Sequence, residues 1–76
     1  MNKARRKTIN EIYDRLAELR DLIEEVKYEE EEYRDNMPEN LQCSERYEIA
    51  DTACDNLDSA ISSIEEALDY IESAAE

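Results

Sequence analysis

Apolar residues recur at alternating intervals of three and four along most of the chain. This spacing runs from Ile9 to Met37 in the first half and from Tyr47 to Ala75 in the second half. It places apolar side chains along one stripe of an α-helix and is typical of coiled coils. The sequence therefore predicts two long helices, at about 3–36 and 44–75, each with one apolar stripe.

The segment 37–43 between the two stripes is predicted to be a connector. Pro38 disfavours a helical conformation at the residue before it. Ser44 or Asn40 can cap the second helix, because both side chains accept hydrogen bonds from free N–H groups at a helix start. A chain of 76 residues is long enough for one small domain. We expect residues 1–76 to form a single all-α helical hairpin.

Charges beside the stripes predict how the helices pair. One flank of the first helix is basic, and the equivalent flank of the second is acidic. These flanks face each other in an antiparallel pair, which predicts the ion pairs Arg34–Asp51, Lys27–Asp58 and Arg20–Glu65. The same register stacks Val26 on Ile61 and Leu19 on Leu68. The sequence thus predicts an antiparallel two-helix coiled coil whose register the charges select.

The other flank of the second helix carries one alanine in every heptad. Such small residues let a neighbouring backbone come close, and a hairpin of two helices leaves one side of its apolar stripes in water. We therefore predict a homodimer that forms a four-helix bundle. Its interface would comprise Leu22, Ala53, Ala60, Ala67 and Ala74. The alternative is a monomer in which Leu22 and the stem of Arg15 cover the alanines.

Composition narrows the function classes. The chain has 22 acidic and 9 basic residues, a formal net charge of −13, no glycine and no histidine. Without glycine there are no phosphate-cradling loops, and without histidine the commonest general base and zinc ligand are missing. The charge opposes direct binding to nucleic acid or to an anionic membrane. We expect no metal and no cofactor.

The order of residues along the chain also indicates localisation and the absence of catalysis. No apolar run approaches the ~20 residues of a membrane span, and no apolar stretch follows the basic start as in a secretory signal. Cys43 and Cys54 would be separated by ~15 Å of helix, too far for a disulfide. The serines of the second helix have no neighbouring base, and two helices offer no cleft. We expect a reduced, cytoplasmic protein that is not an enzyme.

Acidic residues concentrate on the outer side of the first helix, where nothing inside the fold pairs with them. We predict that this face binds a basic protein surface, with carboxylates imitating a phosphate backbone and one tyrosine as an aromatic anchor. Its members are Glu11, Asp14, Glu18, Asp21, Glu25, Tyr28, Glu32 and Asp35. The alternative is a solvated coiled-coil exterior, where glutamate serves helix propensity and solubility only.

The segment from Asn36 to Tyr47, NMPENLQCSERY, resembles the connector of a family of small acidic proteins from phages and prophages of Firmicutes. Those proteins share an N-P-E-N-L-Q-x-S-E-R-like connector between two heptad helices, and the resemblance extends over nearly the whole chain. Cys43 departs from the small residue expected there. The resemblance implies a phage-borne accessory protein, a group that includes inhibitors of host defence such as anti-CRISPR and anti-restriction proteins that mimic DNA.

Together these features predict a phage-type anti-defence inhibitor, whose acidic face binds the nucleic-acid-binding surface of a bacterial defence nuclease in the host cytoplasm. The alternative is a structural module that assembles phage components through its apolar stripe or its alanine flank. A designed hairpin is a third interpretation. The regular charge pairing favours it, whereas the two cysteines and Glu30 within the apolar stripe argue against it.

Overall fold

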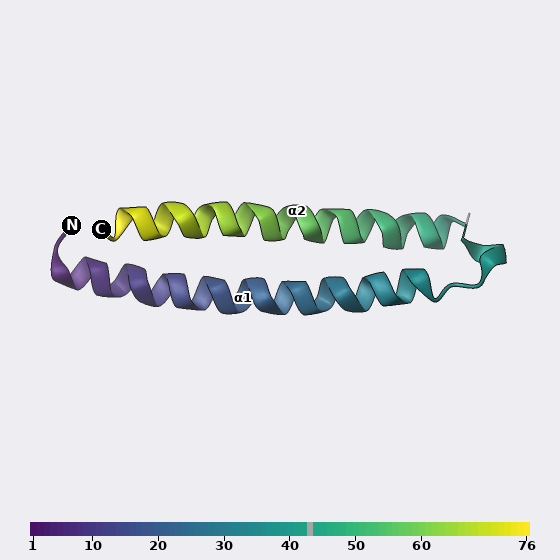
Figure 1. The fold of residues 1–76 in the computed structure, drawn as a ribbon, viewed down its shortest axis with the longest axis horizontal. Helices are drawn as coiled ribbons and strands as arrows, with labels where there is room; N and C mark the ends of the chain where they lie inside the picture. Colours follow the sequence, from purple (N-terminus) through teal and green to yellow (C-terminus); the bar gives the residue numbers. More distant parts are fainter. Residues whose placement is uncertain (43) are drawn as a thin grey trace.

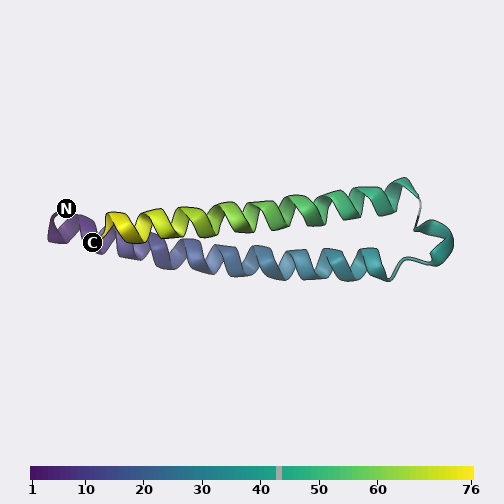
Figure 2. The same cartoon turned by 45° about the horizontal axis from the view of Figure 1, so that its top comes forward.

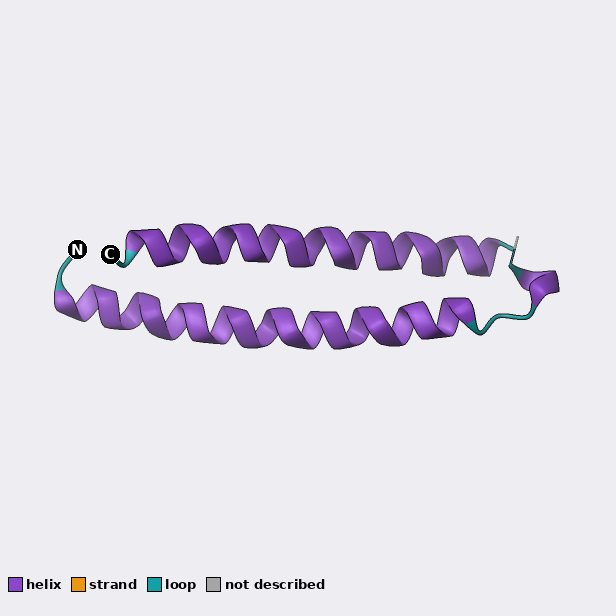
Figure 3. Ribbon diagram, viewed as in Figure 1, coloured by secondary structure: helices purple, strands orange, loops and turns teal. Residues whose placement is uncertain are grey.

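A computed structural model describes residues 1–42 and 44–76, so the expectation of a free thiol at Cys43 lies outside the described residues. The elements are helix α1 (Lys3–Asp35), a short 3-10 helix η1 (Glu39–Leu41) and helix α2 (Glu45–Ala74). No strand occurs in the described part of the chain (Figure 3). The all-α fold class predicted from the sequence is confirmed.

Side-chain caps start both long helices. The Asn2 side chain accepts a hydrogen bond from the Arg5 N–H at 2.8 Å, and the Ser44 hydroxyl accepts one from the Tyr47 N–H at 3.3 Å. Each cap satisfies an N–H group that has no partner inside its helix. Ser44 and Asn40 were both predicted as possible caps of α2, and Ser44 is the residue that caps it.

The two long helices lie side by side and run in opposite directions, as both views of the ribbon show (Figures 1 and 2). The chain termini meet at one end of the molecule, and η1 lies at the other. The hairpin is a narrow rod with extents of 59 × 14 × 12 Å. Its width of about two helices means that each residue of α1 and α2 lies near the surface, and the core is a single row of contacts between α1 and α2.

Ion pairs between the helices define their register. Lys27 Nζ lies 3.2 Å from Asp58 Oδ1, and Arg34 Nη1 lies 2.9 Å from Asp51 Oδ1, as the charge pattern predicts. The third predicted pair, Arg20–Glu65, is wrong. Arg20 pairs instead with Asp21, at 3.2 Å. Asp21 is the next residue along the chain, so Arg20 reaches it without spanning the gap between the helices.

The rotation of α1 about its axis differs from the prediction. In α2 the buried residues are Ala50, Cys54, Ile61 and Leu68, which belong to the predicted apolar stripe. In α1 half of the predicted stripe lies at the surface: Ile12, Leu19, Val26 and Tyr33 are 48%, 53%, 51% and 49% exposed. We call these four residues the outer apolar row. Leu19 and Val26 are therefore less buried than the predicted stacking of Leu19 on Leu68 and of Val26 on Ile61 implies.

Long basic side chains explain this rotation. Only 16% of the Lys27 side chain and 21% of the Arg34 side chain is exposed, although the charged group of each forms an ion pair with a carboxylate of α2. Their aliphatic stems cover apolar surface while the charged heads stay hydrated. Turning α1 to bring this basic row toward α2 moves the outer apolar row away from α2. The stems thus occupy space that the sequence pattern assigns to branched apolar side chains.

Candidate functional surfaces

The structure places the predicted acidic face on the surface of α1. All eight of its residues are exposed: Glu11, Asp14, Glu18, Asp21, Glu25, Tyr28, Glu32 and Asp35. Two of the carboxylates are partly neutralised, since Asp21 pairs with Arg20 and Asp35 pairs with Arg34 at 2.9 Å. Within the described residues the other five carboxylates form no ion pair. They are available to a cation from outside the molecule.

Tyr28 is the aromatic member of this face and is held in place by its neighbours. Its side chain is 56% exposed, and its hydroxyl donates a hydrogen bond to Glu24 Oε1 at 3.0 Å. This hydrogen bond raises the pKa of the Tyr28 phenol. Lys27 Nζ lies 5.4 Å from the centre of the ring, within the range of a cation–π contact. Restraint of this kind lowers the entropy that the ring would lose on binding a partner.

The outer apolar row lies on another side of the hairpin, next to the predicted dimer residues. The register of the ion pairs sets each of its residues level with one alanine of α2: Ile12 with Ala74, Leu19 with Ala67, Val26 with Ala60 and Tyr33 with Ala53. Ala60 and Ala74 are exposed, and Ala53 and Ala67 are half-buried. Leu22, 54% exposed, lies beside this row on α1.

Sequence reasoning missed the outer apolar row as a surface, because it placed those residues inside the hairpin. The low charge of the rows that border it and the alanine flank was the signal that could have shown it. Ile49, for example, is on the neighbouring row of α2 and is 63% exposed. A helix exposing so many large apolar residues on one side carries a surface that a partner can bury.

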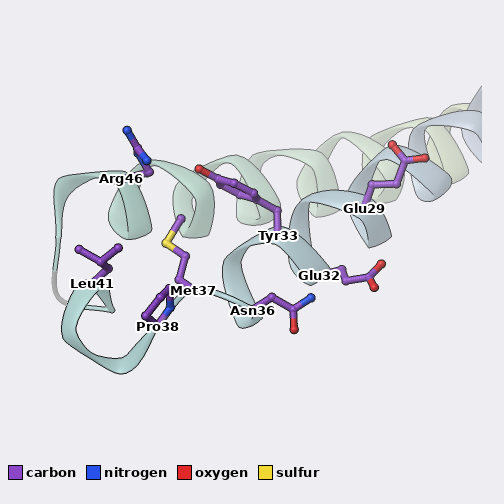
Figure 4. Close-up of a pocket in the computed structure, with 8 residues that line it drawn as sticks. All are labelled: Glu29, Glu32, Tyr33, Asn36, Met37, Pro38, Leu41 and Arg46. Atoms are coloured by element: carbon purple, nitrogen blue, oxygen red, sulfur yellow. The ribbon is translucent and has the colours of Figure 1, made fainter.

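The turn end of the hairpin has a hollow between the two helices. Tyr33, Met37, Pro38, Leu41 and Arg46 are among the residues that line it (Figure 4). The Met37 side chain is only 8% exposed, and the Tyr33 ring extends across the end of α1 toward the start of α2. The buried Met37 side chain therefore closes the apolar core at this end.

Chemically reactive groups are few. Cys54 is 4% exposed, and burial raises the pKa of its thiol, which keeps it protonated and unreactive. In residues 1–42 and 44–76, no group of three or more His, Cys, Asp or Glu side chains is arranged to hold a metal ion. Over the same residues, neither long helix has an apolar stretch sufficient to cross a membrane.

Comparisons of the chain with protein-family models, with curated proteins and with solved structures found no match. The resemblance of Asn36–Tyr47 to a phage connector stays a prediction. A functional argument therefore rests on the two surfaces, the acidic face and the outer apolar row.

Proposed function

We propose that this protein is a non-enzymatic, phage-type anti-defence inhibitor whose acidic face binds the basic, nucleic-acid-binding surface of a bacterial defence protein. The target would be a nuclease of the CRISPR or restriction type, and the inhibitor would act as a DNA mimic. The observation that supports this proposal is the set of exposed carboxylates on α1 that have no internal cation. The resemblance of the connector to phage proteins points to the same class.

The density of charge limits what this face can do. Glu11 and Asp35 are separated by ~36 Å of helix at 1.5 Å per residue, which gives about one carboxylate every 6 Å. A DNA strand carries one phosphate every ~3.4 Å along its axis. The acidic face is thus a sparser polyanion than DNA. Its affinity must come from the match between fixed carboxylates and particular basic residues, with Tyr28 filling an apolar site between them.

A charge-reversal experiment with a matched control tests the proposal. The test variant is E18K/D21K/E25K on the acidic face, and the control is D55K/E66K/D69K, which reverses three exposed acids of α2. Each reversal adds two charges, so both variants change the net charge from −13 to −7. The readout is the plating efficiency of a phage on bacteria that carry a defence system and express each variant.

We expect the test variant to lose protection of the phage and the control variant to keep it. Equal loss in both variants would mean that bulk charge matters and the acidic face does not. Protection by both would rule out mimicry. A pull-down from the same bacteria at low and high salt then identifies the target, since a charge-dependent contact weakens as salt rises.

The outer apolar row favours a second candidate function, that of a structural module. In this case two hairpins associate into a four-helix bundle through Leu22 and the alanine flank, and the acids serve only solubility. The variant A60E/A67E would then abolish function, while E18K/D21K/E25K would be tolerated. Light scattering on the purified protein measures the dimer directly.

A further inference from the structure

The side of the hairpin that carries the outer apolar row has little charge. The two rows that border it and the alanines are Arg15, Leu22, Glu29 and Asn36 on α1, and Ile49, Asn56, Ser63 and Tyr70 on α2. Only Arg15 and Glu29 are charged, and they have opposite signs. Two copies of a chain with a net charge of −13 repel each other, and the repulsion is smallest where neither copy presents acids. This side is therefore the part of the surface on which a second copy of the same chain is repelled least, and a second copy is the occupant that we consider.

Two symmetric arrangements bring these sides together. A two-fold axis parallel to the helices sets the turn of one copy beside the turn of the other. A two-fold axis perpendicular to the helices sets the turn of one copy beside the termini of the other. Helix α1 begins with the basic segment 3–7 and ends with the acidic segment 29–35. The parallel axis would place the two acidic segments at the same end of the dimer, whereas the perpendicular axis places them at opposite ends.

The spacing of residues gives the position of the perpendicular axis. When the axis is level with Leu22, each residue of the outer apolar row lies opposite another residue of that row on the second copy. Leu22 lies opposite itself, and the alanines of α2 pair in the same way. The pairs are Ile12–Tyr33, Leu19–Val26 and Leu22–Leu22 on α1, and Ala53–Ala74 and Ala60–Ala67 on α2. The same axis sets Arg15 opposite Glu29 of the second copy. Alanine against alanine allows the two α2 helices to approach closely.

We infer that the protein forms an isologous dimer about this axis, with α1 antiparallel to the partner α1 and α2 antiparallel to the partner α2. This inference rests on the dimer proposed above and specifies its geometry. The four helices form a bundle with a turn at each end. The acidic faces of the two α1 helices remain outside the interface, so the dimer presents two copies of the acidic face to solvent.

Cysteine cross-linking tests the geometry in a C43S/C54A background, with circular dichroism to confirm that each variant stays helical. We expect L22C to cross-link to itself with a short bis-maleimide. We expect I12C to cross-link in a mixture with Y33C, while each alone stays monomeric on a denaturing gel. A cross-link between L19C and A67C on different chains would instead support the parallel axis and would overturn the inference.

A charge swap provides a second measurement that requires no cross-linker. We expect R15E to weaken the dimer by roughly tenfold, because it replaces an attractive pair by a repulsive one at two symmetric places. The variant R15E/E29R should restore the dimer, since the pair is rebuilt with its signs exchanged. Absence of rescue would contradict the perpendicular axis.

The outcomes separate this inference from the proposals on which it rests. A mass of one hairpin at every concentration would overturn the dimer and its geometry together. A dimer that shows the L19C–A67C cross-link would overturn the geometry alone. Inhibition through the acidic face is measured independently by phage plating. The mass measurement and the cross-linking therefore do not depend on whether the protein is an inhibitor.

Discussion

Lys27 Nζ lies 3.2 Å from Asp58 Oδ1, a contact that joins the two helices across 31 residues of sequence. The same ammonium group lies 3.8 Å from Glu31 Oε1, one turn along α1. Only 16% of the Lys27 side chain is exposed, so its stem lies against the hairpin while its head binds carboxylates. This one side chain therefore affects both the register of the helices and the rotation of α1.

The first prediction concerns alkaline pH. The hydrogen bond to Asp58 raises the pKa of Lys27, and the hydrogen bond to Glu24 raises the pKa of Tyr28. In both cases the folded state favours the protonated form, so the stabilisation is complete below the pKa of the unfolded chain. It is lost as pH rises through the higher pKa of the folded state. We expect the urea midpoint, followed by circular dichroism, to fall above about pH 10.

The variant K27M/Y28F removes both titrating groups and keeps much of their apolar surface. It should show a smaller alkaline fall in midpoint than the parent, although its stability near neutral pH will be lower. An alkaline fall of the same size in both proteins would mean that these two groups do not couple to folding.

The second prediction compares two leucines that the apolar pattern places in one layer. Leu68 is 2% exposed and Leu19 is 53% exposed. L68A should lower the free energy of unfolding by about 2–5 kcal/mol, because it leaves a cavity against α1. L19A should cost under about 1 kcal/mol in dilute solution and should weaken the dimer at high concentration. Equal costs in dilute urea unfolding would indicate that Leu19 is buried as Leu68 is.

The third prediction concerns the cap of α2. Ser44 accepts a hydrogen bond from the Tyr47 N–H and donates one to the Leu41 carbonyl, so it connects the helix to η1. S44A should lower the free energy of unfolding by about 0.5–2 kcal/mol. The matched control is S59A, at an exposed position within α2. A loss no larger in S44A than in S59A would show that the cap contributes nothing.

The helices and their register could be predicted because both depend on where apolar and charged residues recur along the chain. Apolar steps of three and four indicate the helices, and the pairing of Arg34 with Asp51 follows from which charged row faces which. The exposure of the acidic face is predictable for the same reason, since helical periodicity places it opposite the apolar stripe. None of these required knowledge of side-chain conformation.

The rotation of α1 could not be predicted from the pattern, because the pattern treats lysine and arginine as wholly polar. The stems of Lys27 and Arg34 compete with Val26 and Tyr33 for the same apolar surface, and the result depends on where their charged heads find carboxylates. The loss of the Arg20–Glu65 pair has a similar cause, since Asp21 lies closer along the chain. The outer apolar row came from the structure, and the dimer geometry that we infer is argued from it.

The last prediction uses salt to separate the two surfaces. Raising the ionic strength from about 0.05 M to 0.5 M shortens the Debye length from roughly 14 Å to 4 Å. Self-association brings together two chains of charge −13, so screening should strengthen the dimer in sedimentation experiments. Binding of the acidic face to a basic nuclease should weaken over the same range, because screening removes the attraction that brings the partners together.

The variant E18K/D21K/E25K serves as the control, because it changes the acidic face and leaves the outer apolar row intact. It should bind the nuclease weakly at every salt concentration and should dimerise at least as well as the parent, since its net charge is smaller. If dimerisation and nuclease binding instead rose or fell together with salt, the two processes would share one surface. The separation of the acidic face from the apolar interface would then be wrong.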